Sequence, residues 1–366
     1  MKRERGRRMK LQVGVAGLRR GGALFRVFKN RKDAEVVAVC DQDGARAEAF
    51  AREGGVGAHY DDYEKFLKHG MDAVVLATPL PLHATQGILA LEAGRHVLSE
   101  VPAADSLEAC GRIVQAVRRS GMKYMMAENS CYMAYLQSWK QMVADGRIGE
   151  VTYAEAEYIH NCRALMRAPD GGLTWRASMP PIFYCTHSLG PLLMLMEDRC
   201  VSATGLHTGC HVAPDLGAID LEVGLFRTVK GRVIKILNGF SVAREPAFHY
   251  YVVYGSKGVL ETGRPGDGEG TKAFFSDVPH LQGMVRLPLT TNHTGAPPEA
   301  RAGGHGTTEF YMVEDFVRAI REDRTPPIDV YTAMDYSAPG LCAHLSAERG
   351  GVPVEVPDFR EMQSAK

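Results

Sequence analysis

The sequence predicts an α/β domain of the Rossmann type followed by an α+β domain with a large, mostly antiparallel open sheet. From Leu11 to Ala127, short apolar, β-branched runs alternate with amphipathic stretches, which is typical of a parallel, doubly wound sheet. After about residue 150, segments alternate apolar and polar residues between turn residues, as half-exposed antiparallel strands do. A chain of 366 residues is long enough for two domains. We therefore expect one domain over residues 1–128 and a second over residues 129–366.

The predicted strands of the first domain are nearly continuous apolar runs, because strands covered on both faces are buried along their whole length. In chain order they are "LQVGVAG", "AEVVAVCD", "DAVVLATP", "HVLSEVP" and "KYMMAEN". Helices are predicted between them over residues 43–54, 83–93 and 105–120.

The second domain is predicted to contain shorter, alternating strands and two closing helices. The strands are "EVTYAEAEYI", "LEVGLFRT", "RVIKILNGFSV", "HYYVVYGS" and "GVLET", and the helices are "TEFYMVEDFVRAIRED" and "YTAMDYSAPGLCAHLSAERG". Residues 262–305 are rich in glycine and proline without clear periodicity, so we expect a functional loop or lid there. One face of an open sheet stays exposed, which favours a homo-oligomer, either a dimer or a tetramer.

Charge and cysteine content narrow the class of protein. Lys plus Arg and Asp plus Glu both number 43, so no basic surface for nucleic acid is expected. The eight cysteines form no CxxC pair, which indicates reduced thiols in a cytoplasmic protein. The basic start "MKRERGRRMK" precedes an apolar stretch too short for a signal segment or a membrane span. "HTGCH" carries His207, Cys210 and His211 but lacks a complementary ligand pair, so no metal is expected.

A glycine-containing turn follows the first predicted strand and begins the first helix. In "VGVAGLRRGG", Gly17 and Gly22 take the first and third positions of a G-x-G-x-x-G pattern, and Arg19 takes the second. Such a turn presents backbone N–H groups and a helix N-terminus to a pyrophosphate. Arg20 stands beside it. An ordinary strand-to-helix turn remains the alternative.

Asp41 ends the second predicted strand about 20 residues after the glycines. A carboxylate at this place can accept the hydrogen bonds of an adenosine ribose and repel a 2′-phosphate. No arginine follows at Gln42 or Asp43, so the pattern favours NAD over NADP. A strand-end aspartate that caps a turn is the alternative.

The carboxyl ends of the later strands carry the remaining predicted cofactor contacts, since these ends form the ligand crevice of an open α/β sheet. The contacts are Thr78, His83, Glu100, Val101 and Asn129. Taken singly, His83 is also typical of a residue at a helix N-terminus.

These segments together resemble the glucose-fructose oxidoreductase/inositol dehydrogenase (Gfo/Idh/MocA) superfamily over nearly the whole chain. Most dehydrogenases of that superfamily carry Glu-Lys-Pro, whose lysine assists proton transfer, whereas here Val101 stands between Glu100 and Pro102. They also carry an acid four residues before a histidine, where this chain has Phe183 before His187. The resemblance implies NAD as the cofactor.

A narrower resemblance accounts for both departures. "SEVPAA", "MMAENSCY", "GEVTYAEAEYIHNCR", "TWRASMPP" and "FYCTHSLGP" are similar to blocks that occur in the same order in the NAD-retaining α-N-acetylgalactosaminidase family of glycoside hydrolases. That resemblance implies glycoside cleavage by transient oxidation at C3, elimination across C1–C2 and re-reduction with retained NAD. It also assigns NAD contacts to Glu100, Val101 and Asn129.

The same resemblance assigns sugar chemistry to tyrosine and histidine in place of lysine. The expected catalytic residues are Tyr158, Tyr184 and His187, and the expected substrate contacts are Arg176 and Thr186. His305, beside a glycine hinge, is a further expected substrate contact if the preceding loop folds over the site. A phenol near an arginine and a nicotinamide ring is expected to have a lowered pKa. A small carbohydrate or glycoside is the implied substrate. A conventional sugar or inositol dehydrogenase and a non-catalytic NAD-binding protein remain alternatives.

Overall fold

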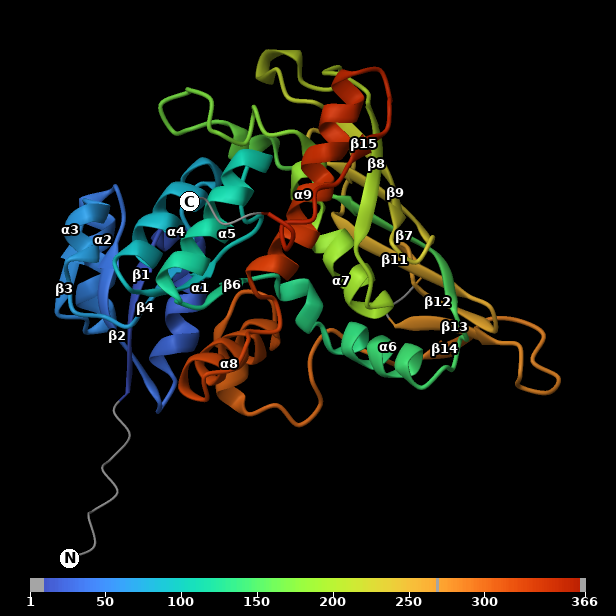
Figure 1. Ribbon diagram of the computed structural model, residues 1–366, viewed down its shortest axis with the longest axis horizontal. Coiled ribbons are helices and arrows are strands. Elements are labelled where there is room, and N and C mark those ends of the chain that lie inside the picture. The colour runs from blue at the N-terminus through green and yellow to red at the C-terminus, as the bar shows by residue number, and fades with distance from the viewer. Residues whose placement is uncertain (1–9, 268–269, 363–366) are drawn as a thin grey trace, which may run out of the picture.

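The structure is a computed structural model that describes residues 10–267 and 270–362, and two sheets dominate it (Figure 1). The basic start, residues 1–9, lies outside the described residues. No helix in the described ranges is both long and apolar enough to span a bilayer.

The first sheet is parallel, with strand order β3-β2-β1-β4-β5-β6, which is the doubly wound order. Its strands are β1 (Leu11–Ala16), β2 (Ala34–Cys40), β3 (Ala58–Tyr60), β4 (Ala73–Leu76), β5 (His96–Ser99) and β6 (Tyr124–Met126). Its helices are α1 (Leu18–Lys29), α2 (Gly44–Gly54), α3 (Tyr63–Leu67), α4 (Leu80–Glu92) and α5 (Leu107–Ser120). The predicted Rossmann-type sheet is confirmed.

Local sequence explains where the helices of this domain begin and end. The Asp43 side chain accepts a hydrogen bond from the Arg46 N–H at the start of α2, and the Ser106 side chain accepts one from the Ala109 N–H at the start of α5. Gly121 ends α5 in the left-handed region at φ 66°. Strand β3 and helix α3, of three and five residues, were not predicted.

The second sheet has nine strands in the order β14-β13-β12-β11-β7-β10-β9-β8-β15 within the described residues. They are β7 (Val151–Ile159), β8 (Cys200–His207), β9 (Leu221–Thr228), β10 (Val233–Gly239), β11 (Phe248–Gly255), β12 (Gly258–Thr262), β13 (Thr271–Phe275), β14 (Val285–Leu287) and β15 (Val354–Glu355). Strand β10 pairs with β7 in parallel and the other pairs run antiparallel. The predicted mostly antiparallel sheet is confirmed, although β8 and β15 were not predicted.

The sequence led us to expect a loop or lid over residues 262–305, but the structure shows strands there. Strands β13 and β14 extend the edge of the large sheet within it, and the short helix η5 (Pro298–Ala302) follows. Thr271, Ala273 and Phe275 point inward in β13 because every second residue is buried. Glycine and proline around these short strands concealed the alternation.

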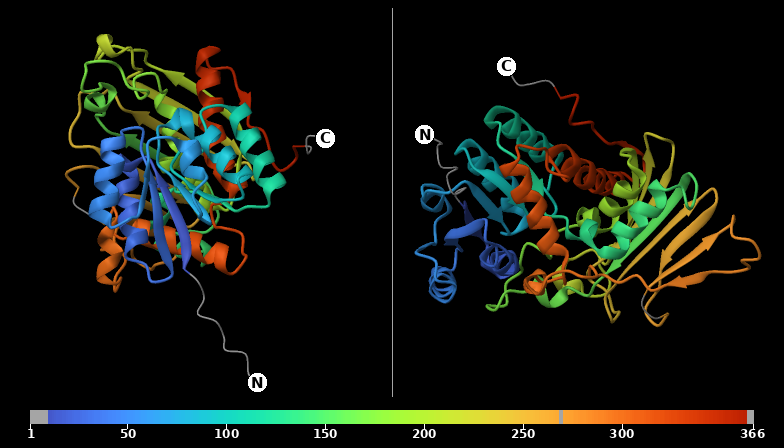
Figure 2. Two further views of the ribbon diagram at one scale, coloured as in Figure 1. Left: turned by 90° about the vertical axis from the view of Figure 1, so that its left-hand side faces the viewer. Right: turned by 90° about the horizontal axis from the view of Figure 1, so that it is seen from below.

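Helices that follow residue 128 cover the inner face of the large sheet and return to the first domain. They are α6 (Ala134–Ala144), α7 (Thr186–Met196), α8 (Thr308–Arg321) and α9 (Val330–Glu348), with the short helices η1 (Asn129–Tyr132), η2 (Arg163–Met166), η3 (Pro181–Cys185) and η4 (Pro214–Leu216). Helix α8 lies beside the first domain and packs against α1 (Figure 2). The expected boundary between residues 128 and 129 stays a prediction.

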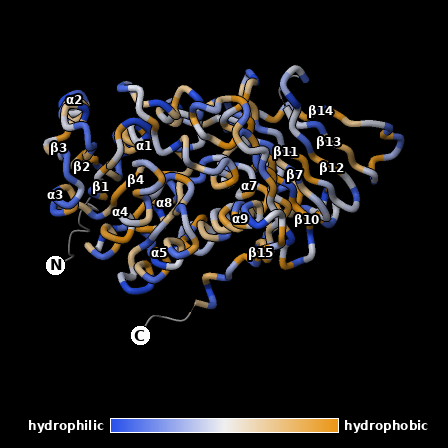
Figure 3. The backbone as a smooth tube through the Cα atoms, turned by 90° about the horizontal axis from the view of Figure 1, so that it is seen from above, coloured by the Kyte–Doolittle hydropathy of each residue, from blue (hydrophilic) through white to orange (hydrophobic). Residues whose placement is uncertain are grey.

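The core between α9 and the sheet depends on close backbone approach. At Gly205 of β8, an added Cβ would lie 2.0 Å from the Ala343 carbonyl oxygen of α9, so only glycine fits. Hydrophobic residues of α7 and α9 occur where these helices lie against the large sheet (Figure 3). The carboxyl edge of the parallel sheet and the inner face of the large sheet meet where Glu128, just after β6, contacts His187 of α7.

Candidate active site

The turn between β1 and α1 fits a dinucleotide pyrophosphate. Gly17 has φ 83°, and a Cβ at this position would lie 2.5 Å from the carbonyl carbon and oxygen of Ala77 and from the Thr78 N–H nitrogen. Glycine alone permits this backbone contact, and α1 begins directly after it at Leu18. A Cβ added at Gly22 would lie 3.0 Å from the Phe50 ring of α2. The turn therefore has the tight approach that the motif requires.

Asp41 lies beside this turn, at the end of β2. Its Oδ2 accepts a hydrogen bond from the Leu18 N–H at 2.8 Å, and its Oδ1 accepts from the Asp43 N–H at 3.0 Å. Arg46 also lies 2.9 Å from Oδ1, because the first turn of α2 brings it back to the strand end. The sequence showed no arginine directly after Asp41, so this neighbour was missed. The carboxylate remains where a ribose would be recognised.

The two arginines of the turn lie differently. Arg19 is exposed, so it does not fill the turn. Arg20 forms ion pairs with Glu100 at 2.7 Å and with Glu309 at 3.2 Å. Burial lowers the pKa of Arg20, but the two carboxylates outweigh it and raise the pKa above its ordinary value. His305 pairs with Glu309 at 2.6 Å, so this network fastens the segment before α8 to the first domain.

The other predicted cofactor contacts lie at the carboxyl edge, with differing exposure. Thr78 is half-buried beside Gly17, whereas Val101 and Asn129 are buried. His83 is 2% exposed, and its two ring nitrogens lie 2.8 Å from the carbonyl oxygens of Pro102 and Thr78. Such a ring fixes the strand ends in place and offers no surface to a ligand. Contact of His83 with NAD stays a prediction.

A carboxylate–imidazole pair lies where the two sheets meet. His187, in the first turn of α7, has its Nδ1 2.6 Å from Oε1 of Glu128, which follows β6 and has no exposed surface. Ser130 contributes its N–H to the same carboxylate oxygen at 3.1 Å. The carboxylate thus orients the ring and holds the Nδ1 proton, which leaves Nε2 of a neutral ring as a proton acceptor.

Tyr158 of β7 lies against this pair on the inner face of the large sheet. Its ring centroid is 5.8 Å from that of His187, 3.7 Å from that of His249 and 5.3 Å from that of Phe240. Its hydroxyl lies 3.1 Å from Nδ1 of His160, two residues further along the chain. Tyr158 is therefore part of a cluster of rings rather than plain sheet surface.

Tyr184 and Arg176 complete the cluster. The Tyr184 ring centroid is 5.2 Å from that of His187, and the Arg176 guanidinium lies 4.4 Å from the centroid of the Trp175 ring. Burial and the charge of Glu100 raise the pKa of Tyr184 to about 12, and the opposing charge of Arg176 is too weak to reverse this. Burial and Tyr184 likewise raise the pKa of Tyr158. In the described protein, desolvation outweighs the arginine. The predicted lowering of the phenol pKa, which depends on a nicotinamide ring beside the phenols, stays a prediction.

Two further predicted substrate contacts are Thr186 and His305. Thr186 has no exposed surface, and its hydroxyl has no hydrogen-bond partner among the described residues, so its contact with a sugar stays a prediction. His305 lies at the segment before α8, bound to Glu309, with a side chain that is 51% exposed. Its contact with a sugar stays a prediction.

Three side chains of the cluster were not identified from the sequence. Glu128 directly precedes the predicted Asn129, and His160 lies two residues after Tyr158, so both were present in the quoted blocks. His249 stands opposite Tyr158 on the neighbouring strand β11, and only strand register could have revealed that pairing.

Comparisons with known proteins agree with this architecture. Residues 11–128 match the oxidoreductase family, NAD-binding Rossmann fold, and residues 217–365 match the glycosyl hydrolase 109 C-terminal domain. A glycosyl hydrolase family 109 protein of Solibacter usitatus (strain Ellin6076) is 28% identical over 389 residues, covering 95% of this chain and 88% of that protein.

Solved structures share the fold at low sequence identity. An oxidoreductase domain protein from Kribbella flavida has a TM-score of 0.82 and 21% identity, covering 95% of this chain and 100% of that one. Levoglucosan dehydrogenase in complex with NADH and L-sorbose has a TM-score of 0.81 and 18% identity, covering 96% and 100%.

The matches, the glycine turn and Asp41 together define an NAD-dependent enzyme of the oxidoreductase type. Its first domain is the NAD-binding Rossmann domain of the Gfo/Idh/MocA oxidoreductases. The chain joins that domain to the C-terminal domain of glycosyl hydrolase family 109. The predicted resemblance and the predicted cofactor are confirmed.

Proposed function

We propose that this enzyme cleaves a glycoside with NAD that it retains between turnovers. The observation that carries the proposal is the pair of His187 and Glu128 beside Tyr158. Val101 also stands between Glu100 and Pro102, where most dehydrogenases of the Gfo/Idh/MocA superfamily carry a lysine. The family 109 relatives support glycoside cleavage over simple oxidation.

The residues that would hold NAD fit it by shape and charge. The backbone at Gly17 and the N-terminus of α1 would bind the pyrophosphate, and the carboxylate of Asp41 would bind the ribose. When bound, NAD supplies a reversible oxidation of a sugar carbinol at C3, which acidifies the neighbouring C2–H.

We assign the proton transfers to side chains according to whether each one can accept a proton or keeps its own. We assign removal of the C2 proton to Nε2 of His187, because Glu128 holds the proton on Nδ1. Tyr158 and Tyr184, whose pKa values are raised, keep their protons and would donate hydrogen bonds to sugar oxygens. The hydroxyl of Tyr158 lies 3.1 Å from Nδ1 of His160, which can hold it in position.

Arg176 would bind a hydroxyl or an N-acetyl carbonyl of the sugar. Its guanidinium stacks on the half-buried Trp175, which fixes its position near both phenols. Elimination at C1–C2, addition of water and re-reduction then give net hydrolysis without the two opposed carboxylates of conventional glycosidases.

A conventional sugar dehydrogenase is the second candidate, because a levoglucosan dehydrogenase shares the fold. One experiment separates the two. Purified enzyme is screened against p-nitrophenyl glycosides of both anomers, with and without added NAD, in deuterated water. Retained-NAD cleavage predicts nitrophenol release without added NAD, one deuterium at C2 of the product and no accumulation of NADH at 340 nm.

Accumulation of NADH with a free polyol, without nitrophenol release, would instead identify a dehydrogenase. If NAD is released by denaturation but no glycoside or polyol reacts, the protein is a non-catalytic NAD-binding protein. A glycoside cleaved without deuterium at C2 would exclude the elimination that we propose.

A further inference from the structure

Residues 292–307 form a closed loop between the large sheet and α8. Hydrogen bonds tie its two ends together. Oδ1 of Asn292 accepts one from the Thr307 N–H at 3.1 Å, and the Thr307 hydroxyl oxygen accepts one from the His293 N–H at 3.0 Å. A loop that is closed at its base behaves as one compact unit, so it can move as a whole.

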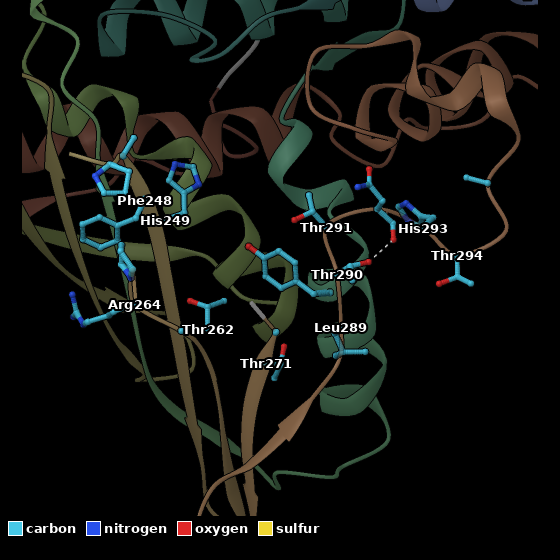
Figure 4. A pocket seen from close by; sticks show the side chains of 18 of the residues that line it. Phe248, His249, Thr262, Arg264, Thr271, Leu289, Thr290, Thr291, His293 and Thr294 are labelled. Atoms are coloured by element: carbon cyan, nitrogen blue, oxygen red, sulfur yellow. Dashed lines mark hydrogen bonds between the residues drawn. The ribbon is translucent and has the colours of Figure 1, made fainter. Parts of the chain in front are cut away.

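Few side chains of this loop contribute to the core. Ala300 is buried, whereas the other residues from 292 to 306 are at least partly exposed. His293 and Thr294 line a cavity of about 920 Å³, so this end of the loop borders open space (Figure 4). The position of the loop therefore depends mainly on polar contacts at its other end.

That other end rests on α1 of the first domain. The Ala302 carbonyl accepts a hydrogen bond from Nε of Arg26 at 3.1 Å. A Cβ added at Gly304 would lie 3.3 Å from Nη1 of Arg20 and 3.5 Å from Cβ of Ala23. Glycine thus lets the backbone of the loop lie close against the helix.

Arg20 connects the loop to the carboxyl edge of the parallel sheet. It lies in the first turn of α1, directly after the turn that we assign to the pyrophosphate. Its Nε lies 2.7 Å from Oε1 of Glu100, which follows β5, and its Nη1 lies 3.2 Å from Oε1 of Glu309 in α8. Since β4 separates β1 from β5 in the sheet, Arg20 spans the end of β4. We call Arg20, Glu100 and Glu309 the Arg20 bridge.

The end of the loop folds around the carboxylate of Glu309, which has no exposed surface. Its Oε1 lies 2.6 Å from Nδ1 of His305, and its Oε2 accepts hydrogen bonds from the His305 N–H at 3.1 Å and the Thr308 hydroxyl at 2.9 Å. A Cβ added at Gly303 would lie only 2.7 Å from this Oε2. The position of the loop and the ion pair between Glu309 and Arg20 therefore depend on each other.

The Arg20 bridge also lies near the reaction centre and the contacts assigned to NAD. Burial has the largest effect on the pKa of Tyr184, and beside it the charge of Glu100 raises this pKa while that of Arg20 lowers it. The assigned NAD contacts run along the same edge, from Asp41 past Gly17 to Glu100. The bridge therefore begins and ends within this row of contacts.

We propose that loop 292–307, held by the Arg20 bridge, closes the NAD site, so that the cofactor is released only after the loop has moved away from α1. The inference rests on the proposed function, because retention of NAD between turnovers is what such a closure would serve. Arg20 and Glu309 are thereby positioning residues of the loop.

The test follows the exchange of NAD from the loaded enzyme. Protein purified with NAD bound is mixed with an excess of the fluorescent analogue etheno-NAD. The slow rise of fluorescence polarisation then reports the rate at which NAD is released. The measurement needs no substrate, so it does not depend on glycoside cleavage.

Two variants open the closure from opposite sides. Arg20→Met removes the bridge from the first domain, and Gly303→Ala displaces the loop from Glu309 without altering the turn. Each should accelerate NAD release about tenfold or more, since each disrupts contacts to a charged group. The matched controls are Arg112→Met, at an exposed arginine of α5, and Gly283→Ala, where nothing lies within 4 Å of the added Cβ. Both controls should release NAD at the wild-type rate.

The double variant separates closure from general loosening of the protein. Arg20→Met with Gly303→Ala should release NAD no faster than the faster single variant, because both changes open the same loop. Effects on the release rate that multiply would overturn the proposal. Acceleration by Arg20→Met alone would also overturn it, because Arg20 would then hold NAD directly.

The proposed function can fail separately. Faster NAD release in both single variants of a protein that cleaves no glycoside would sustain the closure and defeat the proposed function. Glycoside cleavage without added NAD, with equal release rates in wild type and both variants, would overturn the closure alone.

Discussion

Glu128 has no exposed surface and touches the reaction centre only through His187, so we class it as a positioning residue. Glu128→Gln keeps the shape but removes the charge that holds the Nδ1 proton. We expect kcat to fall about 100-fold, with KM and bound NAD little changed, and the pH–rate profile to shift. Glu348→Gln removes a similar partner from His207 at the surface, 3.1 Å away, and should leave kcat unchanged. A kcat within twofold of wild type for Glu128→Gln would refute this role.

Gly17 allows a sharp test of the cofactor turn. Gly17→Ala places a Cβ 2.5 Å from backbone atoms of Ala77 and Thr78 at a positive φ. We expect loss of NAD from the purified protein and a decrease of about 1–3 kcal/mol in the free energy of unfolding. Gly57→Ala is the matched control, since nothing lies within 4 Å of its Cβ position. NAD content by absorbance after denaturation, with chemical unfolding, measures both effects.

Residue types were easier to predict than residue environments. Tyr158, Tyr184, His187 and Arg176 gather near one another as the resemblance implied, although their roles remain predictions. The burial that raises the pKa of Tyr158 could not be predicted, because it depends on how α7 and the large sheet pack, which no local pattern reports. Glu128 was passed over for a related reason: only the fold brings it to His187.

At the scale of elements, α8 is fastened to the first domain by Glu309. Burial raises the pKa of this carboxyl, but the hydrogen bond and charge of His305 and the charge of Arg20 outweigh it and lower the pKa from 4.5 to about 2. A depressed folded-state pKa stabilises the fold above pH 4.5, and this contribution disappears as the pH falls toward 2.

Glu309→Gln should therefore lower the free energy of unfolding at pH 6 by up to about 3 kcal/mol. The difference from wild type should shrink steadily below pH 4.5, as urea unfolding at several pH values would reveal. Glu322→Gln removes an exposed carboxylate of the same region that pairs with Arg318 and Arg324, and should cost less than about 0.5 kcal/mol. A difference that stays constant down to pH 2.5 would contradict the assignment.

Long, periodic elements were predicted well and short ones poorly. The buried strands of the first sheet and the helices α8 and α9 carry enough apolar residues to be seen locally. Strand β13 is five residues long and lies between glycine-rich segments, so its identity depends on pairing with β12. Its prediction would have required knowledge of the sheet that it extends.

At the scale of the whole molecule, the large sheet is covered on one face only. Strand pairing places Leu225, Val233 and Tyr254 on the face of the large sheet opposite to Tyr158. These residues are 48%, 43% and 46% exposed, respectively. Ion pairs such as Lys235 with Glu155 lie among them at 2.7 Å. An apolar surface with a few satisfied charges is typical of a face that a second copy covers.

The predicted homo-oligomer can be tested on this face. Leu225→Lys places a charge on this face, opposite Lys235 and Thr204 on the neighbouring strands. If two copies pair through it, wild type should sediment as a dimer or tetramer at micromolar concentration, and the variant should dissociate to monomer with its NAD still bound. Leu89→Lys on α4, which is 37% exposed on the first domain, should leave the assembly intact. A monomeric wild type would show that this face stays in contact with water, and an oligomer insensitive to Leu225→Lys would place the interface elsewhere.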